Sequence, residues 1–213
     1  MNRLPIALLY WAISEKHLNR NESAARLLYR ALAAGLDTFD LHLELGNVHL
    51  ALGEWVPAQT EYNHCLALDP QNPIPVFNYG LVLRKMGDAD GAIDYYNRAL
   101  RLDPAFREPL MELAILHLQS NRPDEALQAL NAVSETDAIA LSLIGAAHLQ
   151  KDNLDEAQKN LEGALRKNRS LTDARLNLAQ VYRRRGDFAR AARYMRHTER
   201  PRVLARTRAA YVN

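Results

Sequence analysis

The fold is decided by the 34-residue segment 73–106, which reads PIPVFNYGLVLRKMGDADGAIDYYNRALRLDPAF. Its Ala92 belongs to a series of alanines spaced by 34, 34, 34, 31 and 34 residues: Ala24, Ala58, Ala92, Ala126, Ala157 and Ala191. A fixed period of this length is typical of helical repeat proteins. The series therefore predicts six copies of one unit along nearly the whole chain.

Residues of fixed size recur around these alanines. Twelve positions earlier stands a small residue, namely Ala12, Gly46, Gly80, Ala114, Gly145 and Ala179, each preceded by a large apolar one, namely Trp11, Leu45, Tyr79, Leu113, Ile144 and Leu178. Four positions later, one helical turn along the same face, stand Leu28, Tyr62, Tyr96, Leu130, Leu161 and Met195. Small side chains let two helices approach closely, and large ones fill the space beside them. The pattern predicts two packed helices in each repeat.

The turn between the two helices also has a signature. Five positions before each alanine stand residues that tolerate the left-handed conformation in which helices often end: Asn19, Gly53, Gly87, Asn121, Asp152 and Gly186. Two of the second helices run into Asp69-Pro70 and Asp103-Pro104, where proline lacks the amide that would continue the helix. Each repeat is therefore predicted to be helix, tight turn, helix.

Residues such as Leu45-Gly46, Gly53, Ala58, Tyr62 and Leu68-Asp69-Pro70 resemble the tetratricopeptide repeat. The resemblance covers about residues 5–200 and implies an all-α fold, a right-handed α-solenoid superhelix of six helix-turn-helix units. The expected repeats are about 5–38, 39–72, 73–106, 107–137, 138–171 and 172–200. Residues 201–213 would form a C-terminal capping helix or a basic tail. The fourth repeat is three residues short, and the family is functionally diverse, so the resemblance names no pathway.

The chain has 213 residues, of which 48% are hydrophobic and 24% charged. This composition is typical of a folded protein with a hydrophobic core. The uncharged run Leu4 to Ile13 has ten residues, well short of the roughly 18 needed to cross a bilayer, and no signal-peptide cleavage site follows it. We expect a cytoplasmic location and assign this run to the first helix. Exposure of Tyr10 or Trp11 in that helix would indicate a contact with a membrane or a partner.

No group of residues predicts an enzyme, a metal site or a cofactor. The single cysteine, Cys65, occupies a position where other repeats have small apolar residues, so we expect it to pack in the core. His49, His117 and His148 share one repeat position, which places them about a repeat apart and between the two helices of their own repeats. Metal ligands must converge on one ion, so we expect these histidines to contribute to helix packing.

The family resemblance places the binding surface on the concave wall, formed by the first helix of each repeat. Carried over position by position, its groove residues include Leu43, Asn47, Leu50, Phe77, Asn78, Leu81, Arg84, Met111, Ile115, Leu118 and Leu149. Apolar residues predominate in this set, and a contiguous apolar surface often marks a binding site for a peptide or helix of another protein. The alternative is that several of these side chains pack against the neighbouring repeat.

One groove chemistry of the family, the carboxylate clamp for an acidic peptide terminus, is not predicted here. Asn47 and Asn78 match its two asparagines. Leu43 replaces its first lysine, and Glu108 and Glu112 stand where further cations are needed. Carboxylates at those positions would repel an acidic peptide.

The C-terminal end is strongly basic. Residues 166–213 contain 14 Lys and Arg against 3 Asp and Glu, a net charge of +11, whereas the whole chain has +2. Six arginines of the last repeat could bind RNA, an acidic lipid or an acidic protein: Arg183, Arg184, Arg185, Arg190, Arg193 and Arg196. The alternative for Arg183 to Arg185 is a favourable interaction with the dipole at a helix C-terminus.

From sequence alone we therefore expect a non-enzymatic adaptor that binds another protein in an apolar concave groove. The alternatives are an anion-binding module that uses the arginine-rich end and a structural subunit of a larger assembly.

Overall fold

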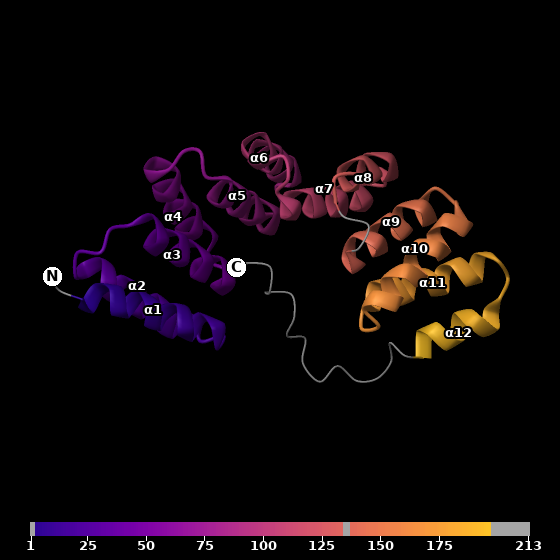
Figure 1. Cartoon of the computed structure of the whole chain (residues 1–213), viewed down its shortest axis with the longest axis horizontal. Helices are drawn as coiled ribbons and strands as arrows, with labels where there is room; N and C mark the ends of the chain where they lie inside the picture. Colours follow the sequence, from indigo (N-terminus) through magenta and orange to yellow (C-terminus); the bar gives the residue numbers. More distant parts are fainter. Residues whose placement is uncertain (1–2, 134–136, 197–213) are drawn as a thin grey trace. The chain divides into compact units, whose positions relative to one another are not determined.

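The computed structural model describes residues 3–133 and 137–196, and these residues form helices joined by short turns and loops. In order, the helices are α1 (Leu4–His17), α2 (Asn21–Ala33), α3 (Phe39–Leu52), α4 (Trp55–Leu68), α5 (Pro73–Met86), α6 (Ala89–Leu102), α7 (Arg107–Gln119), α8 (Pro123–Leu130), α9 (Ala138–Gln150), α10 (Leu154–Lys167), α11 (Thr172–Arg184) and α12 (Phe188–Arg196). Successive helices pack in antiparallel pairs, which confirms the predicted all-α array of helix-turn-helix repeats (Figure 1). The predicted cap, 201–213, lies outside the described residues.

The helices fall into two compact units, α1 to α6 and α7 to α12, divided between Phe106 and Arg107. Helix α8 has 8 residues whereas its neighbours have 13, in keeping with the three residues that the fourth repeat lacks. In the part of the chain that the structure describes, no helix combines the length and apolarity needed to cross a membrane.

All six predicted turn residues have a left-handed backbone: Asn19, Gly53, Gly87, Asn121, Asp152 and Gly186 have φ angles between 53° and 90°. In each turn, the N–H of the next residue donates to the carbonyl five positions before it, at 2.8 to 2.9 Å. This bond satisfies a carbonyl that the helix end would otherwise leave unpaired. The same local geometry therefore reverses the chain within every repeat.

Side-chain caps begin several helices. Thr38 accepts a hydrogen bond from the Leu41 amide at the start of α3, and Asp88 accepts one from the Gly91 amide at the start of α6. The Asp137 carboxylate accepts from two amides of α9. These bonds fix where the chain enters each helix after a turn or loop.

The small residues of the repeat lie where paired helices touch. The six alanines of the 34-residue series are at most 3% exposed. A Cβ atom on Gly46 would lie 2.5 Å from the Tyr62 ring, and one on Gly80 would lie 2.7 Å from the Tyr96 ring. These positions therefore admit no side chain without displacing the aromatic ring of the partner helix.

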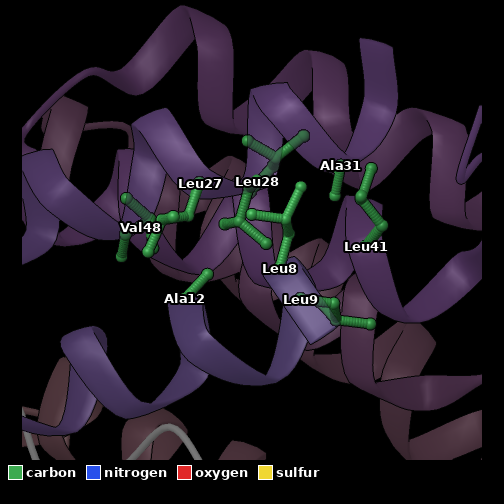
Figure 2. Packing of buried hydrophobic residues seen from close by; sticks show 10 residues of the cluster. Leu8, Leu9, Ala12, Leu27, Leu28, Ala31, Leu41 and Val48 are labelled. Carbon is green, nitrogen blue, oxygen red and sulfur yellow. The ribbon is translucent and has the colours of Figure 1, made fainter. Parts of the chain in front are cut away.

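The core of the first unit shows how neighbouring repeats join. Figure 2 shows Leu27 and Leu28 of α2 close to Leu8 of α1 and to Val48 of α3. These side chains are at most 5% exposed, and their burial spans two repeats. In an isolated helix pair, the side chains that pack against the next repeat would be exposed to water. Each repeat therefore depends on its neighbour for stability.

Two predicted packing residues near the ends of the array are exposed instead. Trp11 of α1 is 56% exposed, whereas Leu45, its equivalent in the next repeat, is fully buried. Met195 of α12 is 42% exposed, whereas its equivalent Leu161 is fully buried. Leu45 and Leu161 belong to core clusters that include residues of a neighbouring repeat, whereas Trp11 and Met195 lie in the first and the last described helix.

Two glycines of the second unit make the packing constraint testable. A Cβ on Gly145 of α9 would lie 2.6 Å from Leu161, whereas a Cβ on Gly163 of α10 would meet its nearest neighbour at 3.5 Å. We expect Gly145→Ala to lower the free energy of unfolding by about 1 to 3 kcal/mol through overpacking. Gly163→Ala should raise it by about 0.5 to 1 kcal/mol, because alanine costs less backbone entropy in a helix. Urea denaturation followed by circular dichroism measures both, and effects of the same sign would contradict this packing.

Candidate functional site on the inner helix faces

A buried hydrogen-bond network joins the first helices of the second and third repeats. The Asn47 side-chain oxygen on α3 accepts a bond from the Tyr62 hydroxyl at 2.9 Å and one from the Asn78 amide group at 3.0 Å. All three side chains are buried. Asn47 therefore links α3 to its own second helix, α4, and to the next first helix, α5. Both asparagines of the predicted groove serve the junction between repeats.

Six of the eleven predicted groove residues are buried: Asn47, Phe77, Asn78, Leu81, Met111 and Leu149. The Phe77 ring packs 5.5 Å from the Tyr96 ring and 5.3 Å from the Phe106 ring, measured between centroids. Neighbouring aromatic groups thus cover Phe77, and both Phe77 and Met111 are buried in the chain alone. The sequence had left open that these positions serve packing between repeats.

The other five groove residues are half-buried: Leu43, Leu50, Arg84, Ile115 and Leu118. Leu43 and Leu50 lie on α3, on either side of the buried Asn47, and both pack partly against the core around Tyr62. They lie seven residues apart, two helical turns along one face. Leu43 and Leu50 therefore form a short, half-buried apolar stripe along the face of α3 that includes Asn47.

An ion pair that the sequence analysis did not predict lies beside this stripe. The Lys16 ammonium of α1 lies 2.6 Å from the Glu44 carboxylate of α3, and both side chains are at most 17% exposed. The only sequence signal was Lys16 at a position where the other first helices have mostly apolar groove residues. The pair fixes α1 against α3 and places polar atoms at one edge of the apolar stripe.

Arg184 and Arg185 of the basic end form ion pairs with the preceding repeat. Arg184 of α11 donates to the Leu149 carbonyl at 2.7 Å and to Asp152 at 2.9 Å, and Arg185 pairs with Asp155. These bonds join the last repeat to the one before it. They give Arg184 and Arg185 a structural role that the helix-dipole argument did not foresee.

Arg190 has a different neighbourhood. It pairs with Asp187 at 3.3 Å, and its guanidinium lies 5.5 Å from the centre of the Tyr182 ring. Arg183, Arg193 and Arg196 are exposed. All six arginines that the sequence grouped together are exposed, and three of them, Arg184, Arg185 and Arg190, also form ion pairs within the repeats.

Comparison with protein families agrees with this architecture. One model described as tetratricopeptide repeat matches residues 11–73 and 143–201, more than half of the chain, and a second matches residues 83–139. The chain belongs to the tetratricopeptide repeat family.

The chain is similar to proteins whose names indicate different functions. It is 29% identical to the protein O-mannosyl-transferase Tmtc3 of Drosophila melanogaster over 136 residues, 62% of this chain but only 15% of that protein. It is 29% identical to the photosystem I assembly protein Ycf3 of Acaryochloris marina over 115 residues, 52% of this chain and 69% of that protein. The solved PilF structure of Pseudomonas aeruginosa aligns with a TM-score of 0.78 at 19% identity, covering 93% of this chain and 91% of that one. That likeness establishes the fold.

The reactive side chains of this tetratricopeptide repeat chain have packing roles. Cys65 is fully buried, its thiol donates to the Phe39 carbonyl at 3.6 Å, and burial raises its pKa to about 12. A thiol with this pKa is almost entirely protonated at neutral pH, so it is a poor nucleophile. Among residues 3–133 and 137–196, no three His, Cys, Asp or Glu side chains form a group that could hold a metal ion.

The histidines at the shared repeat position differ in their contacts. His49 of α3 was expected to lie between the helices of its own repeat, but its Nε2 atom lies 2.8 Å from the Tyr29 hydroxyl of α2, in the preceding repeat. Its Nδ1 atom lies 2.5 Å from Glu54 in the turn. His49 therefore bridges two repeats. His117 of α7 has a lowered pKa, because burial and the nearby Arg122 disfavour its charged form.

Carboxylates contact both ring nitrogens of His42. Its Nδ1 atom lies 2.6 Å from Glu61 and its Nε2 atom 2.9 Å from Asp37, while its ring stacks on His64 with 4.7 Å between centroids. Burial alone would lower the pKa of His42, but hydrogen bonds to the two carboxylates and their charges outweigh it, so the pKa is raised. Both ring nitrogens face acceptors, and only the imidazolium can donate from both.

The asparagine network predicts a fixed order of stabilities. Tyr62→Phe removes one donor while the Asn47 oxygen keeps its bond from Asn78, so we expect a loss of about 1 kcal/mol in the free energy of unfolding. Asn47→Ala removes the shared acceptor and leaves two buried donors unsatisfied, at about 1 to 3 kcal/mol each. Urea denaturation of both variants measures this order, and a larger loss for Tyr62→Phe would contradict the network.

The charged state of His42 predicts a pH dependence. Its pKa is raised in the folded chain, so its contribution is complete below the unfolded-chain pKa of about 6.5 and disappears as pH rises through the folded value. We expect the difference in unfolding free energy between the wild type and His42→Asn to shrink from pH 6 to pH 9. The facing titratable groups Asp37, Glu61 and His64 remain in both proteins. A difference that is constant or grows with pH would show that His42 is not held as an imidazolium.

Proposed function

We propose that this protein is a non-enzymatic scaffold that binds a peptide or helix of another protein along the inner faces of its first helices. The observation that carries the proposal is the half-buried apolar stripe of Leu43 and Leu50 on α3. Half-buried leucines beside a rigid buried network offer apolar area to a partner, and they lose little conformational entropy on binding because packing already restricts them. The photosystem I assembly protein Ycf3, to which the chain is similar, has an assembly function by its name, in keeping with a scaffold.

The surroundings of the stripe indicate the chemistry of the partner. The half-buried Arg84 of α5 lies on the neighbouring first helix, and the Lys16 and Glu44 pair lies on the other side. The stripe is thus apolar at its centre and polar along its edges, which is the usual anatomy of an interface. An amphipathic helix with apolar residues three or four positions apart fits such a surface.

The first test locates the partner on the surface. A photo-crosslinking p-benzoylphenylalanine replaces Leu50 in the full chain, and a control chain contains it instead of Val56, which is 66% exposed on the second helix α4. We expect a discrete protein to crosslink through position 50 and not through position 56. Crosslinking through position 56 alone would place the partner on the outer helices and contradict the proposal.

The second test measures affinity with the purified partner. We expect Leu50→Gln to weaken binding about tenfold or more, since a polar group would be buried in the interface, and Val56→Gln to leave it unchanged. Melting temperatures of both variants separate a binding effect from unfolding. An unchanged affinity for Leu50→Gln would remove the inner face from the binding site.

A further inference from the structure

The second unit has an arginine-lined pocket formed by both helices of the last repeat and the second helix of the repeat before it. Its volume is about 930 Å³, and it lies between α10, α11 and α12, neighbouring helices in Figure 1. Four arginines line it, Arg166 from α10, Arg169 from the following loop, Arg175 from α11 and Arg193 from α12, together with Leu165 and Tyr194. Of these arginines, the sequence singled out only Arg193 as a candidate for anion binding.

Basic residues outnumber acidic ones in the described lining of this pocket. Glu162 is the acidic residue of that lining, beside the exposed arginines Arg166, Arg169 and Arg193. The Glu162 oxygen Oε1 already accepts hydrogen bonds from Gln158 at 2.8 Å and from the Tyr182 hydroxyl at 3.2 Å. Guanidinium charges around one pocket repel each other, and an anion bound there would relieve the repulsion.

Several basic residues near the pocket form ion pairs. Arg184, Arg185 and Lys151 each pair with an aspartate of the preceding repeat. By contrast, Arg166, Arg169 and Arg193 are exposed, and none of them forms a salt bridge with a carboxylate of residues 3–133 and 137–196. Arg175 donates to the Arg169 carbonyl, which ties α11 to the loop of the pocket. Helix and loop thus hold the arginines around one space.

The shape of the pocket limits what the anion can be. A guanidinium fork binds two oxygens of a carboxylate or a phosphoryl group, but a carboxylate has one charge and matches one arginine. A phosphoryl group has nearly two charges and three free oxygens, which several arginines can share. RNA binding would need stacking surfaces along a track, and the pocket has one aromatic ring, Tyr194, already stacked on Tyr182 with 5.7 Å between centroids.

We propose that this pocket binds a phosphoryl group on a phosphorylated side chain of a partner protein, with Arg166, Arg169 and Arg193 contacting the oxygens. Leu165 and the edge of Tyr194 would contact the apolar part of the same peptide. The site is independent of the inner-face stripe, because it uses other residues in the other compact unit. Each proposal can therefore fail without the other.

The test uses the full chain with arginine side-chain N–H signals observed by NMR. The probes are a short phosphoserine peptide, the same peptide with serine or aspartate, inorganic pyrophosphate and a ten-nucleotide oligouridine. We expect the phosphoserine peptide and pyrophosphate to shift the signals of the pocket arginines, and the serine peptide to shift none. Binding of pyrophosphate without the phosphoserine peptide would overturn the protein partner as the source of the phosphoryl group.

A matched charge control separates the pocket from general electrostatics. The pocket variant is Arg166→Gln/Arg193→Gln, and the control is Arg26→Gln/Arg30→Gln, which removes two exposed arginines from α2 in the other unit. We expect phosphoserine peptide affinity to fall at least tenfold in the pocket variant and to stay within twofold in the control. Pyrophosphate should raise the melting temperature of the wild type and of the control but not of the pocket variant.

Three outcomes would overturn the proposal. Equal losses in the two double variants would show that only net charge attracts the probes. Equal affinity for the aspartate and phosphoserine peptides would show that the pocket is not built for a phosphoryl group. Oligouridine binding that is tighter than phosphopeptide binding and lost in the pocket variant would assign the pocket to RNA.

Discussion

Close approach of the two helices within each repeat is the constraint on which the rest of the structure depends. The Tyr62 and Tyr96 rings lie directly over the Gly46 and Gly80 backbone, where even a methyl group would overlap the ring. Such contact fixes the spacing of the helices and lets the large side chain fill the space between them. The Tyr62 hydroxyl then reaches Asn47, which in turn binds Asn78 in the next repeat. The packing of one pair is thereby transmitted to the pair that follows it.

The fold could be predicted from the sequence because its determinants are local and periodic. The turn residues Asn19, Asn121 and Asp152 replace glycine in three repeats and still adopt positive φ, because asparagine and aspartate tolerate the left-handed region best among residues with a side chain. Each turn makes the same five-residue backbone bond, independent of which repeat contains it. Because the same turn geometry recurs in all six repeats, the residues that it requires recur at a fixed spacing, which can be recognised in a single sequence.

The candidate site could be predicted only in part, because exposure depends on neighbours that periodicity does not specify. Phe77 and Leu43 occupy equivalent positions in successive repeats, yet Phe77 is buried by Tyr96 and Phe106 while Leu43 stays half-buried. The two carboxylates that hold His42 come from Asp37, five residues before it, and Glu61, nineteen residues after it. Neither repeats along the chain, so neither could stand out from the sequence. Contacts that occur once become visible only when the helices are placed in space.

The arginines of the second unit also divide into those whose contacts follow the repeat spacing and those whose contacts occur only once. Arg184 and Arg185 find acidic partners 32 and 30 residues earlier, about one repeat away, so these bonds strengthen the junction that the repeat itself creates. The arginines of the pocket come from α10, the loop after it, α11 and α12, and three of them, Arg166, Arg169 and Arg193, are exposed and form no salt bridge with a described residue. A net charge of +11 over residues 166–213 cannot distinguish these cases, because it counts paired and unpaired arginines alike. Surface ion pairs contribute little stability, so unpaired arginines persist at small cost. Their position around one cavity is the observation that led us to propose a binding site rather than a solvated face.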